Sequence, residues 1–127
     1  GLAIVDKRRP SPGKSKVMNI IGNVKSKTCI IVDDIIDSGG TIVNAAQALK
    51  ERGAKEVYVY ITHGVLSGEA VEKIKKSVIK KLVITDTIDN SQRVKKAKNI
   101  EVLSISNLMS EAIKRISNST SVSDLFK

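Results

Sequence analysis

The sequence predicts an α/β fold in which a parallel sheet is flanked by helices. Short apolar runs alternate along the chain with segments whose apolar residues recur at helical spacing. The links between these segments are short, and strand–helix–strand units with short links form right-handed parallel crossovers. In addition, the apolar run that starts at Thr28 does not alternate with polar residues, which is typical of a strand buried on both faces of a parallel sheet.

The N-terminal part of the chain is expected to be extended. Residues 2–6 read as a strand, 7–16 as a basic loop punctuated by Pro and Gly, and 17–24 as an extended segment that bends at Gly22-Asn23. The chain opens on the first strand with neither a Met nor a polar leader. We therefore expect the sequence to be a fragment of a longer protein.

A buried strand and a helix follow. The strand at 28–33 ends at two adjacent carboxylates, and the helix runs from about residue 40 to 52. Its apolar face comprises Ile42, Ala45, Ala46 and Leu49. Gly53 is a natural C-terminal cap for this helix.

The second half of the chain continues the alternation. Strands are expected at 57–62, 82–85 and 100–105. Ser67 is expected to cap a helix after the first of them, and Glu69 to favour the positively charged start of that helix. The apolar face of this helix comprises Ala70, Val71, Ile74 and Val78. A final helix is expected to turn inward Leu108, Met109, Ala112, Ile113 and Ile116, ahead of a polar tail at 117–127.

Composition limits the classes of partner. A length of 127 residues suits one domain, and the net charge of +9 favours anionic ligands such as nucleotides and phosphates. Aromatic residues make up only 2%, which argues against single-stranded nucleic acid, since its bases usually stack on aromatic rings. No apolar run approaches bilayer length, so no membrane partner is expected. The lone Cys29 cannot form an intrachain disulfide, and a reducing, cytoplasmic compartment fits best.

The loop at 33–41 is the strongest candidate site. Two carboxylates (Asp33, Asp34) follow the buried strand, and then come Asp37, Ser38, Gly39, Gly40 and Thr41 at the start of a helix. Carboxylates suit sugar hydroxyls or a metal ion, while glycines, hydroxyls and a helix N-terminus suit phosphate. A magnesium-binding acidic helix is disfavoured by the glycines, and an acidic turn without function by carboxylate repulsion. The pattern predicts a sugar-phosphate site at the carboxyl edge of the sheet.

Two further segments remain open from their residues alone. In the basic stretch 7–16, Gly13-Lys14-Ser15 mimics the end of a Walker motif, but Arg8 stands where the earlier glycine is required. The stretch is either a solvated loop or localisation patch, or a mobile cationic arm that closes over phosphates. His63 ends a strand and is more often structural than a base, because no Ser or Cys partner is evident; Thr85-Asp86-Thr87 can line the same cleft.

Several of these segments resemble the motifs of a known enzyme family. The run from Val32 to Thr41 resembles the PRPP-binding motif of type I phosphoribosyltransferase folds, where PRPP is phosphoribosyl pyrophosphate. Five other segments resemble, in the same order, ribose-phosphate pyrophosphokinase (PRPP synthetase): 6–10, 17–22, 62–68, 85–88 and 121–126. The resemblance covers nearly the whole chain and corresponds to the C-terminal part of that family's subunit.

The resemblance implies a fold and an activity. Residues 1–127 would form a partial, C-terminal, phosphoribosyltransferase-like (Rossmann-like) domain, with the N-terminal domain absent. The family's enzymes are magnesium-dependent transferases of nucleotide biosynthesis (ribose-phosphate diphosphokinases). They bind ATP and move its pyrophosphate to ribose 5-phosphate, giving PRPP and AMP. They assemble into hexamers built from dimers, and the fragment alone is expected to be inactive because the missing domain supplies most of the ATP site.

The resemblance also implies roles for particular residues. Lys7 and Arg9 match the family's catalytic basic pair on a flexible loop. Asp33 and Asp34 would hold the ribose hydroxyls, directly or through magnesium. The 5-phosphate would be held by Asp37, Ser38, Gly39, Gly40 and Thr41, although many relatives carry Thr-Ala-Gly-Thr where this chain has Ser-Gly-Gly-Thr. In the tail, Ser121, Ser123 and Phe126 match a region near an interface that binds a regulatory nucleotide or phosphate.

Two other functions compete with this one. The chain can be a non-catalytic module or regulatory subunit that binds ribose phosphate or PRPP, although such a module has no need of the Lys7/Arg9 pair. It can also be a phosphoribosyltransferase that acts on a base, a class that shares the acidic loop but not the basic arm or the tail.

Overall fold

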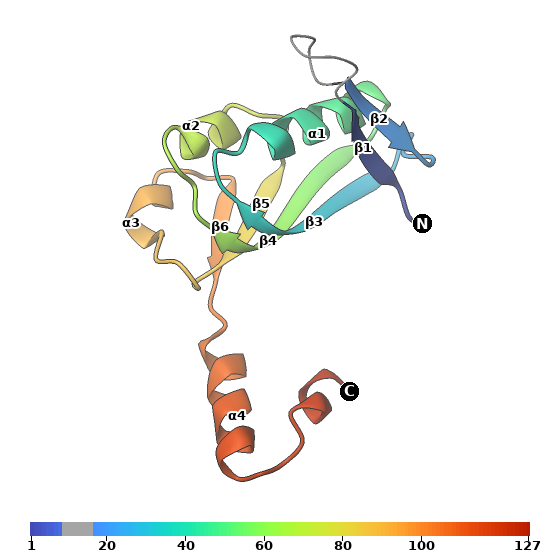
Figure 1. Cartoon of the computed structure of the whole chain (residues 1–127). Coiled ribbons are helices and arrows are strands. Elements are labelled where there is room, and N and C mark those ends of the chain that lie inside the picture. The colour runs from blue at the N-terminus through green and yellow to red at the C-terminus, as the bar shows by residue number, and fades with distance from the viewer. Residues whose placement is uncertain (9–16) are drawn as a thin grey trace.

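The chain folds around a four-stranded parallel sheet, as the alternating pattern predicts. A computed structural model of the chain describes residues 1–8 and 17–127. The sheet has the order β3 (Thr28–Ile36), β4 (Glu56–Gly64), β5 (Lys81–Thr85) and β6 (Ile100–Leu103). The connections carry α1 (Gly40–Glu51), α2 (Ala70–Lys75) and α3 (Ser91–Val94). Each strand pairs with the next along the chain, so the carboxyl ends of all four strands meet at one edge (Figure 1).

The two N-terminal strands form a separate hairpin. Strands β1 (Ile4–Arg8) and β2 (Val17–Ile21) pair antiparallel, with Ile4 opposite Ile21. Neither pairs with the four-stranded sheet, and Figure 1 shows them beyond the β3 edge, next to α1. The outer edge of β3 has no strand partner among the described residues.

Helix α1 confirms the sequence prediction most closely. Its buried residues are Ile42, Ala45, Ala46 and Leu49, the four that recur at helical spacing. Its C-terminus is closed by Gly53, whose φ is +88°. The Gly53 amide donates to the Lys50 carbonyl (2.9 Å) and the Ala54 amide to the Leu49 carbonyl (3.0 Å). These paired bonds form a Schellman motif, which accounts for the glycine at this position.

Helix α2 is shorter than its apolar pattern predicts. It spans six residues from Ala70, and its N-cap residue is Glu69, whose side chain makes no capping hydrogen bond. The prediction that Ser67 caps it is therefore wrong. Ala70 and Ile74 are buried as expected, but Val78 lies beyond the helix and is 37% exposed. The Ser77 hydroxyl bonds to the Ile74 carbonyl, which ends the helix before Val78 can join its face.

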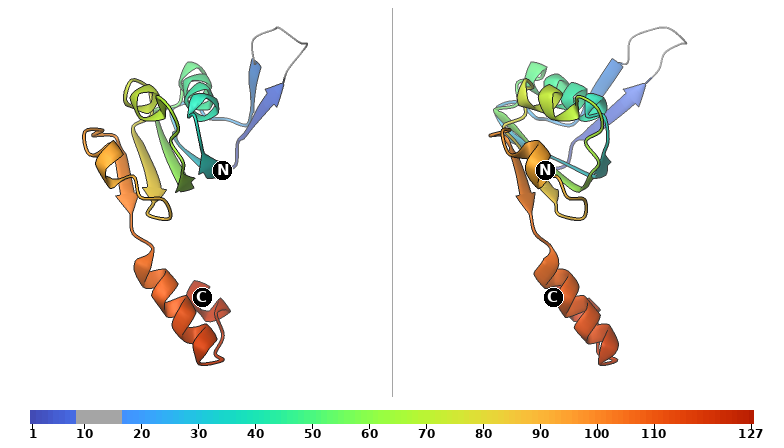
Figure 2. Two further views of the ribbon diagram at one scale, coloured as in Figure 1. Left: turned by 60° about the vertical axis from the view of Figure 1, so that its left-hand side comes forward. Right: turned by 90° about the vertical axis from the view of Figure 1, so that its left-hand side faces the viewer.

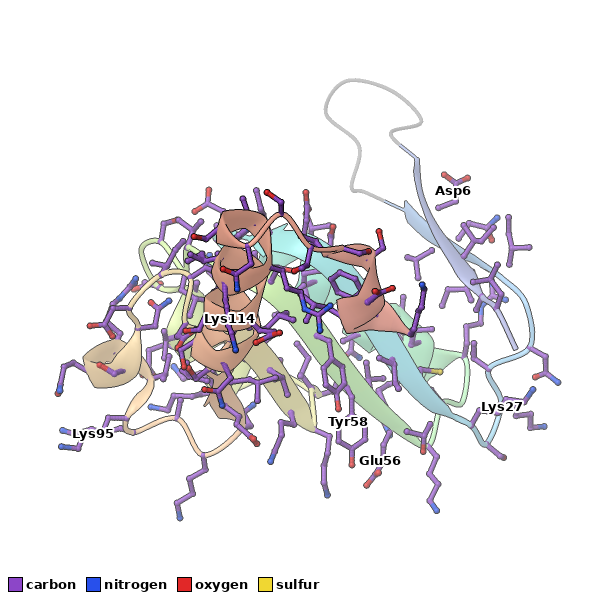
Figure 3. All side chains as sticks on the ribbon, turned by 90° about the horizontal axis from the view of Figure 1, so that it is seen from below. Asp6, Lys27, Glu56, Tyr58, Lys95 and Lys114 are labelled. Atoms are coloured by element: carbon purple, nitrogen blue, oxygen red, sulfur yellow. The ribbon has the colours of Figure 1, made fainter. Side chains whose placement is uncertain are left out.

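The prediction that β3 is buried on both faces is wrong. Its outward residues Ile30 and Val32 are 61% and 76% exposed. Helices α1 and α2 lie together on the opposite face of the sheet (Figure 2), so side chains that alternate to the other face meet no helix. Figure 3 looks onto the open face, where Tyr58 and Glu56 lie close together and share a hydrogen bond of 3.1 Å. The hydrogen bond from Tyr58 lowers the pKa of Glu56, and a hydrogen bond from Lys80 lowers it further.

The prediction that the last helix packs inward is also wrong. Helix α4 (Ser106–Ser117) has no buried residue and stands away from the sheet (Figures 1 and 2). Ile113 and Ile116 are 61% and 67% exposed, because no described segment lies against this apolar face. Among the described residues, moreover, no helix is long and apolar enough to cross a bilayer.

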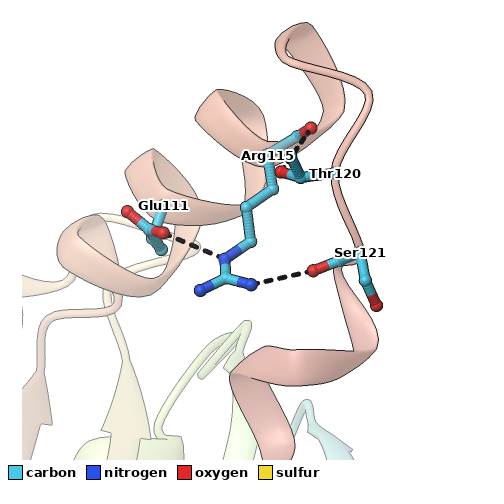
Figure 4. Close-up of polar contacts among 4 residues, drawn as sticks. All are labelled: Glu111, Arg115, Thr120 and Ser121. Atoms are coloured by element: carbon cyan, nitrogen blue, oxygen red, sulfur yellow. Dashed lines mark hydrogen bonds and ion pairs between the residues drawn. The ribbon is translucent and has the colours of Figure 1, made fainter.

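The C-terminal tail is tied to α4. A short 3-10 helix, η1 (Ser123–Phe126), follows it. The Arg115 guanidinium donates to the Glu111 carboxylate and to the Ser121 carbonyl, each at 2.9 Å, and Thr120 bonds back to the Arg115 carbonyl (Figure 4). The tail is therefore bonded to α4 through Arg115.

Candidate functional site

The start of α1 has the geometry of an anion site. Gly39 precedes the helix with φ +76° and ψ −11°, a left-handed conformation that a residue with a side chain enters only at a cost. No side chain caps the helix. The first amide groups of a helix have no acceptor within it, so those of residues 40–42 are available to a ligand. Together with the macrodipole, they favour a phosphate at this point.

The carboxylates lie differently from what the sequence predicts. Strand β3 continues to Ile36, so Asp33 and Asp34 lie within the strand rather than beyond its end. Both are exposed, and the Asp33 carboxylate accepts the Asp34 amide at 2.9 Å.

Asp33 and Thr41 line the same cavity. The cavity has a volume of about 760 Å³ and extends along the unpaired edge of β3, between α1 and β1. Its walls include Asp33 and Thr41 at one end, together with residues 1–5 of the hairpin. The remaining wall is mostly apolar, from the β3 edge and the inner face of α1. Asn23, Lys27 and Thr28 also line the cavity, so polar partners for a ligand are not confined to the Asp33–Thr41 end.

A second polar cluster lies at the carboxyl ends of β4 and β5. His63 Nδ1 is 2.9 Å from the Thr87 hydroxyl, while the hydroxyls of Thr85 and Thr87 both donate to the Thr62 carbonyl, at 2.6 and 3.2 Å. The 85–87 turn therefore lies beside His63, and that the two line one ligand cleft stays a prediction. Because His63 bonds to a threonine hydroxyl, and no Ser or Cys side chain is bonded to it in the described part of the chain, its contacts suit a structural role.

Two residues that support this edge escape sequence reasoning. Asn90 is 1% exposed and donates to the Gly64 carbonyl at 2.5 Å, and Arg93 donates to the Val65 carbonyl at 3.1 Å. Both stand in a polar stretch that resembles any solvated loop. Their role depends on contacts more than twenty residues away, for which the sequence contains no signal.

The basic arm falls largely outside the described residues. The backbone of Lys7 lies in β1 opposite Met18. Arg9 lies outside the described residues. Of the tail residues, Phe126 is 76% exposed and Ser123 lies in η1, far along the chain from the acidic loop.

The described residues can form a metal site only when a bound substrate supplies further oxygen ligands. No group of three or more His, Cys, Asp or Glu side chains converges in the described part of the chain. Magnesium, however, is commonly held by one or two carboxylates and completed by substrate phosphates and water. Asp33 and Asp34 meet that lesser requirement.

Comparison with known proteins finds similar sequences over almost the whole chain. The family model of the phosphoribosyl synthetase-associated domain matches residues 5–127. A ribose-phosphate pyrophosphokinase from Hyphomonas neptunium is 64% identical over 125 residues, which are 98% of this chain and 40% of that protein. One from Bradyrhizobium diazoefficiens is 61% identical, with 98% and 39% covered.

A solved structure has a similar fold. The crystal structure of phosphoribosylpyrophosphate synthetase from Mycobacterium smegmatis matches with a TM-score of 0.77 and 37% identity, covering 84% of this chain and 35% of that one. The chain thus spans about two fifths of the length of the curated relatives it matches. The family match extends over all but the first four residues, and the chain belongs to the phosphoribosyl synthetase-associated domain family.

Proposed function

We propose that the chain is the C-terminal, phosphoribosyltransferase-like part of a ribose-phosphate pyrophosphokinase subunit, which makes PRPP and AMP from ATP and ribose 5-phosphate. The observation that carries the proposal is the uncapped start of α1, with Gly39 at φ +76°, directly after three carboxylates at the carboxyl edge of the sheet. The relatives that match this chain at 57–64% identity are named for that activity.

In this proposal the 33–41 loop binds the sugar. The amides at the start of α1 and the hydroxyls of Ser38 and Thr41 hold the 5-phosphate, with Gly39 allowing the close approach. Asp33 and Asp34 accept hydrogen bonds from the ribose hydroxyls. The same two carboxylates would hold magnesium together with substrate oxygens; when bound, the ion supplies positive charge that offsets the negative charge of the phosphates.

The reaction is a pyrophosphoryl transfer. The oxygen of the sugar 1-hydroxyl bonds to the β-phosphorus of ATP, the bond from that phosphorus to the oxygen bridging the α-phosphate breaks, and AMP leaves with the bridging oxygen. The hydroxyl proton passes to solvent. Lys7 and Arg9 are assigned to neutralise charge on the transferring group, because such reactions are catalysed mainly by positioning and positive charge.

A chimeric subunit tests the proposal. The segment of the Hyphomonas neptunium relative that matches this chain is replaced by the chain itself, and AMP formation from ATP and ribose 5-phosphate is measured. We expect activity near that of the relative. A chimera that is folded, as judged by its melting curve, yet forms no AMP overturns the proposal. Binding of ribose 5-phosphate without turnover would instead favour the non-catalytic binding module.

The basic arm has its own test. In the chimera, Lys7→Ala should lower kcat by about 10³-fold or more, the scale on which a catalytic cation acts in phosphoryl transfer. The affinity for ribose 5-phosphate should change little. Lys98→Ala, which removes an equal charge from an exposed position, is the matched control. Normal turnover of the Lys7 variant rules out the assigned role.

Assembly, regulation and compartment are proposed from the family resemblance. The subunit is a homo-oligomer in the cytoplasm, and Ser121, Ser123 and Phe126 contribute to a regulatory site at a subunit interface. The exposed apolar face of α4 and the free thiol of Cys29 support this setting. Sedimentation of the chimera tests whether the subunit is an oligomer. Measuring phosphate activation of the Ser123→Ala variant of the chimera tests the regulatory site.

A further inference from the structure

The 64–66 loop comprises Gly64, the last residue of β4, together with Val65 and Leu66, and it is bonded directly to the end of β3. The amides of Val65 and Leu66 both donate to the carbonyl of Ile36, at 2.9 and 3.1 Å. Ile36 is the last residue of β3 and immediately precedes Asp37, the first residue of the 37–41 turn. Because both bonds converge on one carbonyl, a shift of the 64–66 loop moves the point from which the turn departs.

The 64–66 loop is strained and needs support. Leu66 has φ +50°, a left-handed conformation that is unfavourable for a residue with a branched side chain. Its side chain is fully buried, so packing holds it on one side. Its backbone amides are used by Ile36, and its three carbonyls point away and require donors of their own.

All three carbonyls are bonded by side chains from one short segment. Asn90 donates to Gly64 at 2.5 Å. Arg93 donates to Val65 at 3.1 Å through one guanidinium nitrogen and to Leu66 through the other. The first of these nitrogens is also 3.4 Å from the Asn90 amide oxygen, so Asn90 orients the guanidinium that it accompanies. A planar, forked donor can bind two successive carbonyls at once, which a lysine ammonium cannot do in the same way.

We propose that Arg93, oriented by Asn90, is a positioning residue for the sugar-phosphate turn. It acts through the 64–66 loop and Ile36 and touches no substrate. The amides of the loop therefore donate to β3, and its carbonyls accept hydrogen bonds from Arg93 and Asn90. Removing the guanidinium leaves two carbonyls without their donors and frees the strained loop to relax. The turn that binds the 5-phosphate then loses its fixed starting point. This inference rests on the function proposed for residues 33–41.

The test combines kinetics with a readout that needs no ligand. In the chimera, Arg93→Met should raise KM for ribose 5-phosphate by about tenfold, with KM for ATP changed less than about twofold, since misplaced binding groups are costly while a remote site is spared. Arg93→Lys keeps the positive charge but loses the forked guanidinium, so its KM for ribose 5-phosphate should lie between those of the unmodified protein and of Arg93→Met. Amide hydrogen exchange at residues 38–41 of the ligand-free protein should be faster in Arg93→Met than in the unmodified protein.

A matched pair of asparagines separates positioning from general stability. Asn99, like Asn90, donates its amide to two backbone carbonyls, here those of Ile74 and Ile79 at 2.9 and 3.3 Å. Asn90→Ala and Asn99→Ala are expected to lower the melting temperature similarly, but only Asn90→Ala should raise KM for ribose 5-phosphate.

Each outcome decides the matter. The inference is overturned if Arg93→Met leaves both KM and exchange at 38–41 unchanged, or if both asparagine variants alter KM equally. Should Arg93→Met fail to fold, Arg93→Lys and Asn90→Ala carry the same test. Failure of the proposed function is recognised separately, because the unmodified chimera would then form no AMP while the exchange comparison still stands.

Discussion

Replacing Gly64 by Ala should destabilise the chain through a single buried contact. A Cβ at this position would lie 2.7 Å from Cδ1 of Ile84 and 3.2 Å from its Cγ2. Carbon atoms pack best at about 3.5–4.0 Å, so the first contact is roughly 1 Å too short. Ile84 is fully buried and cannot swing into solvent. The backbone of Gly64 is itself held, by pairing opposite Ile36 and by the bond from Asn90.

The expected cost is that of overpacking a core, about 1–3 kcal/mol in the free energy of unfolding. Ile84→Val alone should cost about 0.5–1.5 kcal/mol, because it removes one buried methyl group. That group is the Cδ1 atom that clashes. The double variant should therefore be more stable than the sum of the two single changes, by at least about 0.5 kcal/mol.

Urea unfolding of the 127-residue chain and its variants measures all four corners of this cycle. Gly40→Ala is the control. A Cβ there meets nothing within 4 Å, so the substitution should be neutral or stabilise the helix by up to about 1 kcal/mol. Additivity within about 0.3 kcal/mol, or a Gly64 variant as stable as the Gly40 variant, would refute the contact as the cause.

Three further predictions follow from single features. Gly39→Ala should cost about 1–2 kcal/mol from its positive φ and weaken phosphate binding in calorimetry; unchanged stability would contradict the left-handed turn. Hydrogen bonds from the Ser104 side chain, and to a lesser extent from the Ile105 amide, lower the pKa of Asp86. The stabilisation that these bonds give should persist above the ordinary pKa of 3.8 and be lost as the pH falls below it. The Ile105 amide resonance should shift over that pH range, and Asp86→Asn should abolish the shift. Ile113→Ser should change the unfolding free energy of the chain by less than about 0.5 kcal/mol in urea, and a larger loss would show that the α4 face is covered.

Much of the fold was predictable because it depends on local signals. Helix α1 needs only the spacing of its apolar residues and a glycine able to adopt positive φ after its last turn. The parallel sheet follows from short links between strands and helices. The candidate sugar-phosphate site at residues 33–41 could likewise be proposed from the sequence, because its acids, hydroxyls and glycines are adjacent in the chain.

The errors share one cause, which is that burial is set by neighbours distant in the chain. The outward apolar residues of β3 and the apolar face of α4 are what a covered face requires, yet nothing among the described residues buries them. Ser67 is a good capping residue, but the helix begins three residues after it. The strand also continues past Asp33 and Asp34, because β4 offers backbone partners as far as Gly64.

The sequence alone determined the order of elements, the inner face of α1 and the chemistry gathered at residues 33–41, since each depends on residues close together along the chain. Only the tertiary structure decided that β3 continues past Asp33 and Asp34 and that Arg93 and Asn90 bond to residues 64–66 at the end of β4. Those relations join residues more than twenty positions apart, and they depend on backbone groups that look alike in every sequence.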